Sequence, residues 1–336
     1  YTRGVAAPQS AMLKKDDLMA SLSTGEKRAL YLLYILFDLE RIRQQAIAGG
    51  GQFLIIADDI ADSFDYKNKY AIIEYLNDLG STTGIDLMIL THNFDFYRTV
   101  KSRLGVARTN CYIAQRDEEG VISISEFKYQ KDFFKNVVIK GIKDGNIVDD
   151  DKKKLLISSI PFYRNLCEYS GKEDEYAKLT CFLHLKSTPL NTQAVQISEL
   201  WNIIKPFLDG VSFSGNDENY FSAIIRIATA CVADNTNEVL LDNKLVIAIA
   251  IRLLTEKFMQ RIITTNGQTC ADANSNQTRE WYKKSERFLT PDQKAIIEEV
   301  NLITPESIHL NSFMFEPLID ISDWVLKELF TKVSVL

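Results

Sequence analysis

The chain has 336 residues, of which 46% are hydrophobic and 25% charged, and its net charge is −6 at neutral pH. This composition excludes a disordered or fibrous chain, and the length fits two domains. The acidic balance argues against a broad nucleic-acid coat. No apolar run is long enough to span a membrane, so no membrane partner is expected. The five cysteines never stand in C-x-x-C spacing, which argues against a disulfide framework or zinc site and predicts a cytoplasmic protein.

The first segment with chemical content begins at Leu22, where the chain reads LSTGEK. An amphipathic stretch then predicts a helix over residues 30–47, stopped by three glycines. A short apolar run at 53–57 predicts a buried strand, directly followed by Asp58 and Asp59. A helix over 66–79 and a second buried strand over 86–90 follow, and the latter ends at Thr91-His92-Asn93.

Strand, helix and strand in this order predict a parallel sheet, because both strands have the composition of buried strands. Polar residues at the carboxyl ends of such strands meet in one crevice, where ligands bind. Here these residues are Asp58, Asp59 and His92. The Ser-x-Gly turn that opens the first helix adds backbone N–H groups suited to phosphate. Together these features predict nucleotide hydrolysis.

Residues 22–100 resemble the C-terminal half of an ABC-type ATPase head of the SMC-like branch. LSTGE is similar to the family signature LSGGQ, and FLIIADD resembles the Walker B strand with its catalytic acid. ADSFD resembles the D-loop and LTH the switch-histidine loop. The resemblance implies an α/β fold class, with an ATPase lobe built on a parallel sheet and an all-α domain after it. Each motif alone would suit a helix cap or a loop, but four in order favour the ATPase.

The resemblance also implies roles for the residues at the strand ends, with ATP as substrate and Mg²⁺ as cofactor. Asp58 is expected to hold Mg²⁺, directly or through water. Asp59 occupies the place of the usual glutamate, which polarises the attacking water. Aspartate is one methylene shorter, so its reach to that water differs. His92 is expected to contact the γ-phosphate.

The signature residues Ser23, Thr24, Gly25 and Glu26 are expected to bind ATP held by a second subunit. The γ-phosphate contacts come from Ser23 and Gly25, and Asp65 is expected to lie across the interface. The resemblance therefore implies a homodimer of heads.

One motif of the family does not occur in this sequence. No G-x-x-x-x-G-K-[ST] is present anywhere, so the loop that cradles phosphate and its lysine are missing. We expect either that the sequence is the C-terminal part of a longer protein or that its N-terminal lobe is not represented. As it stands, the chain is not expected to form a complete ATP site.

Residues 109–127 alternate apolar and polar positions around an acidic turn, which predicts a hairpin that completes the sheet. The domain boundary is placed near residue 150, giving an ATPase lobe at 1–150 and an all-α effector domain at 151–336. Helices of the second domain are predicted from apolar periodicity at 153–170, 173–186, 197–207, 220–233, 243–263, 291–300 and 322–333.

The second domain carries an Arg–Glu pair and a distant histidine. Arg252 and Glu256 lie one helical turn apart on a largely apolar helix, and His309 follows much later. A metal-independent ribonuclease needs such a set, since histidine can take the ribose 2′-OH proton and arginine can grip the phosphate. The alternatives are that Arg252 and Glu256 form an ordinary helix salt bridge and that His309 is a structural histidine. His184, in CFLHLK, is predicted to be a core histidine.

An R-x-x-x-E set with a distant histidine, in a helical domain behind an SMC-like head, resembles the PrrC and RloC anticodon nucleases. This resemblance implies a HEPN-like domain that cleaves tRNA within an ATP-regulated antiviral defence protein. The alternative is an SMC-like sensor or scaffold that binds a partner effector or DNA and has no nuclease activity. A DNA-repair ATPase is a third reading. A membrane-transporter subunit is disfavoured because no proline follows the acid pair.

Overall fold

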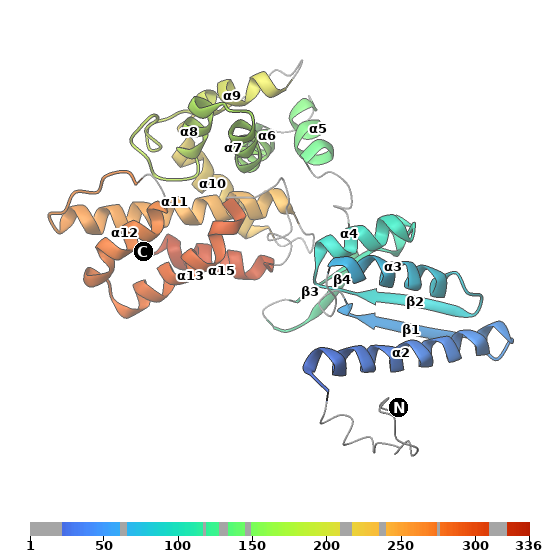
Figure 1. Ribbon diagram of the computed structural model, residues 1–336. Helices are drawn as coiled ribbons and strands as arrows, with labels where there is room; N and C mark the ends of the chain where they lie inside the picture. Colours follow the sequence, from blue (N-terminus) through green and yellow to red (C-terminus); the bar gives the residue numbers. More distant parts are fainter. Residues whose placement is uncertain are drawn as a thin grey trace. The chain divides into compact units, whose positions relative to one another are not determined.

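The computed structural model describes residues 22–60, 66–116, 119–127, 134–144, 149–208, 217–234, 240–273, 276–308 and 321–336. The chain forms two compact units, Tyr1–Val106 and Ala107–Leu336 (Figure 1). The sequence placed the domain boundary later, near residue 150, and that assignment stays a prediction. None of the helices in these ranges is long and apolar enough to cross a bilayer.

The first unit is built on one parallel strand pair, β1 (Phe53–Asp58) and β2 (Ile85–Leu90). Helix α3 (Tyr66–Gly80) connects them, since parallel strands need a crossover connection. Phe53 pairs with Ile85 and Asp58 with Leu90, so both strands end at the same edge. The inward faces of both strands pack with Leu76 and Leu79 of α3 into a small core. Figure 1 shows α3 lying along the strand pair.

The other face of the strand pair is apolar but exposed. Leu54 and Ile56 of β1 are 59% and 57% exposed, and Met88 and Leu90 of β2 are 47% and 45% exposed. Parallel strands are normally covered on both faces, which is why their sequences read as continuous apolar runs. Within the described residues, helices cover this pair on one face.

Two further helices complete the first unit. Helix α2 (Thr24–Ile47) contributes Ala46 to the small core and ends before Gly49, whose φ of 74° is the left-handed conformation that stops a helix. The first half of α2 also carries apolar side chains outside the face that packs on the core, and of these Tyr34 and Phe37 are exposed. Helix α4 (Phe94–Arg103) follows β2 and packs on α3 through Phe96 and Val100.

The expected α/β ATPase lobe built on a parallel sheet is wrong. The described chain is mostly helical, with two small sheets of two strands each, and no extended parallel sheet is present among these residues. The hairpin β3 (Tyr112–Arg116) and β4 (Ile122–Glu126) was expected to complete the sheet, but its strands pair antiparallel with each other. The apolar runs identify strands correctly, yet they supply two parallel strands where a lobe needs more.

The second unit continues from the hairpin into a series of helices. Its elements besides β3 and β4 are η2 (Arg108–Asn110), η3 (Phe134–Ile139), α5 (Lys140–Lys143), α6 (Asp149–Ser158), α7 (Ile160–Tyr169), α8 (Glu173–Thr180), α9 (Ile197–Ile204), η4 (Lys205–Phe207), α10 (Tyr220–Ala233), α11 (Leu241–Thr265), α12 (Gln277–Ser285), η5 (Glu286–Phe288), α13 (Pro291–Ile308) and α15 (Asp323–Ser334).

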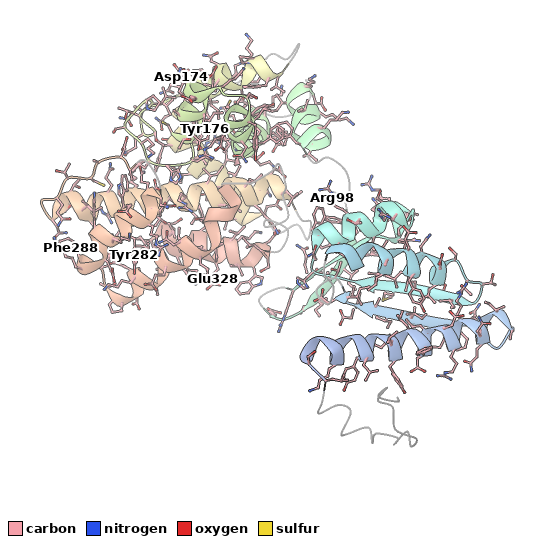
Figure 2. The ribbon with its side chains drawn as sticks, in the orientation of Figure 1. Arg98, Asp174, Tyr176, Tyr282, Phe288 and Glu328 are labelled. Carbon is pink, nitrogen blue, oxygen red and sulfur yellow. The ribbon has the colours of Figure 1, made fainter. Side chains whose placement is uncertain are left out.

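Helix α11 forms the centre of this unit. Every residue from Leu241 to Leu253 is buried, and α6, α10, α12, α13 and α15 contact the helix (Figure 1). A helix that is covered all round is apolar over most of its surface, as in the sequence LVIAIAI of residues 245–251. The surrounding helices are also linked to one another, since the Tyr282 hydroxyl of α12 donates to Glu298 of α13 at 2.6 Å. Tyr282 is labelled in Figure 2.

Replacing Leu245 of α11 by alanine tests this packing. Leu245 is fully buried, so Leu245→Ala should lower the free energy of unfolding by about 2–5 kcal/mol. Leu302→Ala is the matched control, because Leu302 of α13 is 81% exposed and its loss should change little. All three tryptophans, Trp201, Trp281 and Trp324, lie in the second unit, so urea unfolding followed by their fluorescence reports on it alone. Equal losses from both variants would contradict a core centred on α11.

Candidate functional site

The carboxyl ends of β1 and β2 bring together the polar residues that the sequence singled out. Asp58 is the last residue of β1 and is exposed. Asp59 follows with a φ of 51°, a left-handed conformation that is uncommon outside glycine, although aspartate tolerates it better than most residues. The Asp59 N–H donates to the carbonyl of Leu90 at 2.9 Å, which ties the turn to the end of β2.

Asp59 and His92 form a close pair. Asp59 Oδ2 lies 2.7 Å from His92 Nδ1, and the side chains are 40% and 66% exposed, respectively. The other carboxylate oxygen, Asp59 Oδ1, is buried and accepts no hydrogen bond from the described residues. A left-handed aspartate and an orphaned carboxylate oxygen are departures from ordinary packing of the kind that gather at functional sites.

The turn that carries His92 is fixed by its neighbours. The Asn93 side chain caps α4 by accepting from the Phe96 N–H at 2.9 Å, and the Asn93 N–H donates to Thr91 Oγ1 at 3.1 Å. Asparagine is a favoured N-cap because its side-chain oxygen satisfies an orphan N–H of the first turn. The residues on both sides of His92 are therefore held by the start of α4.

The signature residues open helix α2. The helix begins at Thr24, and the Lys27 N–H donates to the Ser23 carbonyl at 2.9 Å, so Ser23 occupies the N-cap position. Gly25 and Glu26 therefore lie in the first helical turn, where backbone N–H groups point outward and favour an anion. Asp65, expected at a dimer interface, lies outside the described residues.

The strand ends also fit the expected Mg²⁺. Among the described residues, no cluster of three or more histidine, cysteine, aspartate or glutamate side chains could hold a metal alone. Mg²⁺ does not require one, since it is usually held by one or two carboxylates together with waters and substrate phosphates. Exposed Asp58 is a carboxylate of this kind.

The second predicted site, at Glu256, is buried. The Glu256 carboxylate is fully buried, and its Oε1 accepts from Thr278 Oγ1 at 2.6 Å and lies 2.8 Å from His184 Nδ1. Its Oε2 accepts from the Leu185 N–H at 2.7 Å and from Gln277 Nε2 at 2.9 Å. Helix α11, the turn after α8 and the start of α12 therefore meet at one carboxylate.

Arg252 completes this buried cluster through Thr278. Arg252 Nη1 donates to Thr278 Oγ1 at 2.5 Å, and that hydroxyl in turn donates to Glu256. Nε and Nη2 of Arg252 have no hydrogen-bond partner in the described part of the chain. Burial lowers the pKa of Arg252 to about 10, so the side chain stays charged at neutral pH. Burial raises the pKa of Glu256, but His184, Arg252 and Thr278 together outweigh it and hold that pKa at about 2.

The histidine beside Glu256 is His184, which sequence reasoning did not connect to the Arg–Glu pair. His184 is 6% exposed and lies beyond the end of α8, where the predicted helix was expected to continue. Its apolar neighbours in CFLHLK indicate burial, but no sequence signal pairs it with a residue 72 positions away. His309 lies outside the described residues, so its expected convergence with Arg252 and Glu256 stays a prediction.

Comparisons with known proteins find similar sequences whose names state no function. No protein-family model matches the chain, and no solved structure matches it. Two curated Staphylococcus aureus sequences, one from strain MRSA252, match, and both are named "Uncharacterized chromosomal cassette SCCmec type IVc protein CR006". Each is 28% identical over 117 residues, which cover 34% of this chain and 16% of the relative. The chain thus matches a small part of much longer proteins whose names state no activity.

The buried carboxylate gives a stability prediction. Glu256→Gln removes the charge that balances Arg252, and should lower the free energy of unfolding of the second unit by about 3 kcal/mol or more. Glu280→Gln, at a half-exposed glutamate that lies 2.9 Å from Lys283, is the control and should change it by less than about 0.5 kcal/mol.

The same carboxylate predicts a pH dependence. Because folding lowers the pKa of Glu256 from 4.5 to about 2, its contribution to stability is complete above pH 4.5 and is lost as the pH falls through 2. Tryptophan-monitored unfolding of the wild type should therefore weaken over this range. A Glu256→Gln variant that weakens equally between pH 4.5 and 2 would show that other groups carry the effect.

Proposed function

We propose that the first unit is the hydrolytic part of an ATPase that acts as a homodimer of heads. The observation that carries the proposal is the Asp59–His92 pair, which joins the ends of two parallel strands at 2.7 Å. An acid–histidine pair at the carboxyl end of parallel strands suits general acid–base work on a bound ligand. Asp58, the residue directly before Asp59, adds a carboxylate for Mg²⁺.

Each group then has a separate task. Asp58 holds Mg²⁺, which when bound neutralises charge on the β- and γ-phosphates. His92 and Asp59 act on the attacking water and the γ-phosphate. The start of α2, with Ser23 and Gly25, offers backbone N–H groups to ATP on the opposite subunit.

The site is composite. Because the sequence contains no G-x-x-x-x-G-K-[ST] loop, another polypeptide segment must supply the loop that cradles the phosphates. Hydrolysis is therefore a property of the complex between this chain and the segment that supplies the loop, here called the assembled ATPase. All five cysteines are free thiols, in keeping with a cytoplasmic location.

The second unit is proposed as the element that nucleotide state controls, as in an SMC-like sensor or scaffold of a defence complex that binds a partner effector or DNA. The burial of Arg252 and Glu256 favours this role, since RNA cleavage needs groups that a scissile phosphate can reach. The tRNA-nuclease hypothesis has no observation of its own in its favour and stays a prediction.

Removal of the Asp58 carboxylate tests the hydrolytic assignment. Asp58→Ala should lower the rate of ATP hydrolysis by the assembled ATPase roughly a hundredfold or more, because charge stabilisation through the metal is worth several kcal/mol at the transition state. Asp86→Ala is the control, since Asp86 is also exposed on this strand pair but follows the first residue of β2, at the opposite end. Phosphate release measures both, and normal turnover by Asp58→Ala would exclude this carboxylate from catalysis.

Gly25→Asp tests the action of the signature across the dimer. An aspartate in the first turn of α2 adds bulk and negative charge where a phosphate of the opposite subunit is expected. We expect ATP binding to persist while ATP-dependent dimerisation, measured by light scattering, and hydrolysis are lost. A Gly25→Asp protein that still hydrolyses ATP would refute the role of the signature.

A further inference from the structure

The uncovered face of the strand pair carries an acid at each end. We call the exposed side chains on this face of β1 and β2 the strand face; they are Leu54, Ile56, Asp58, Asp86, Met88 and Leu90. Because Leu54 pairs with Asp86 and Leu90 with Asp58, the two acids lie at opposite ends of the face, with apolar side chains between them. Two strands about 4.8 Å apart form a strip that a single helix, about 10 Å wide, can cover.

Helix α2 has an apolar stripe that faces away from its own core. Leu39 and Ala46 of α2 pack into the small core of the first unit. On the opposite side of the helix, four apolar residues follow the i, i+3, i+4, i+7 spacing of one face: Leu30, Leu33, Tyr34 and Phe37. We call these four side chains the outer stripe, and the last three of them are 51%, 69% and 75% exposed. Large apolar side chains that gather on an exposed surface mark an interaction site.

The outer stripe lies between two cations, just as the strand face lies between two acids. Lys27 precedes the stripe by one helical turn and Arg41 follows it by one. The two cations are about 21 Å apart along the helix axis and the two acids about 13 Å apart along the strands, so a cation at each end has about 4 Å to span. Long basic side chains can do so. Arg41 also lies 3.4 Å from Asp38 of its own helix, an exposed pair of a kind that contributes little.

These charges decide which surfaces can meet. Two strand faces repel each other in either orientation, because an acid then meets an acid, and two outer stripes bring cation to cation in the same way. An outer stripe on a strand face instead places apolar side chains together in the middle and opposite charges at both ends. Both surfaces belong to the first unit, so the partner with the matching chemistry is a second copy of this chain.

We propose that α2 of one copy lies on the strand face of a second copy, and that this contact holds the homodimer of heads together. The orientation of the contact rests on the proposed ATPase function. With Lys27 at the Asp58 end of the strand face, the start of α2 with Ser23 and Gly25 lies at the carboxyl ends of the partner's strands, where ATP is proposed to bind. Arg41 then lies near the partner's Asp86. The reverse orientation would leave the signature at the far end of the strand face.

The first test measures self-association of the full chain without nucleotide, by sedimentation velocity between about 1 and 100 μM. The wild type should associate as its concentration rises. Phe37→Asp breaks the outer stripe and Ile56→Asp the strand face, so each should raise the concentration needed roughly tenfold or more, because an unpaired charge then enters an apolar contact. Leu302→Asp, at an exposed leucine of the second unit, is the control and should associate as the wild type does.

A mixture of the two variants separates this contact from other kinds of association. Phe37→Asp keeps an intact strand face and Ile56→Asp an intact outer stripe, so an equimolar mixture should associate better than either variant alone. A wild type that stays monomeric over this range, or a mixture that associates no better than its components, would overturn the proposal. Met88→Asp replaces Ile56→Asp if the latter loses the circular-dichroism spectrum of the wild type, since Met88 pairs with Ile56 on the same face.

Disulfide trapping between two cysteine variants under mild oxidation tests the orientation. Arg41→Cys mixed with Asp86→Cys should form a cross-linked dimer on a denaturing gel, whereas Lys27→Cys mixed with Asp86→Cys should not. The wild type, with its five free thiols, gives the background. The opposite pattern would overturn the proposed orientation. Neither test needs turnover, so absence of hydrolysis by the assembled ATPase would overturn the proposed function while self-association through these two surfaces still stands or falls on its own result.

Discussion

The parallel register of β1 and β2 decides where the polar groups of the candidate site lie. Pairing of Asp58 with Leu90 brings both strands to one edge, and the next backbone hydrogen bond, from Asp59 to Leu90, turns the chain there. Because side chains alternate along a strand, a slip of one residue would send the acids to the other face. The short reach from Leu90 to His92 then brings the ring to the Asp59 carboxylate at 2.7 Å.

A different constraint organises the second unit. Helix α11 is covered on all sides, yet it carries an arginine and a glutamate in its buried length. An unpaired buried charge would cost several kcal/mol, so the Glu256 carboxylate is satisfied by donors from the turn after α8 and from α12. These donors lie far apart in sequence. The polar cluster therefore ties the turn after α8 and the start of α12 to one position along α11.

The sequence predicted local structure well and the sheet poorly. The apolar run at 53–57 and the one at 86–90 are present as β1 and β2, because short buried strands have a clear composition. The number of strands in a sheet depends on pairing between distant segments, which periodicity does not encode. The hairpin at 112–126 has the expected alternation, but nothing in that alternation says that, among the described residues, its strands pair only with each other.

The candidate residues show the same division. Asp58, Asp59 and His92 could be predicted together, because the carboxyl ends of parallel strands meet at one edge. The left-handed backbone of Asp59 and its buried oxygen could not, since both depend on the exact path of the turn. The sequence did not pair His184 with Glu256, because this is a tertiary contact between a turn and a central helix.

The most direct test of the hydrolytic site is a transition-state mimic. Nitrogen-15 NMR of the assembled ATPase, with Mg²⁺, ADP and vanadate added, can follow His92 and His184 in one sample. We expect the His92 ring signals to shift on addition of the mimic, while buried His184, which belongs to the other unit, keeps its signals. Unchanged His92 signals in a sample that binds ADP and vanadate would contradict the assignment of the Asp59–His92 pair to ATP hydrolysis.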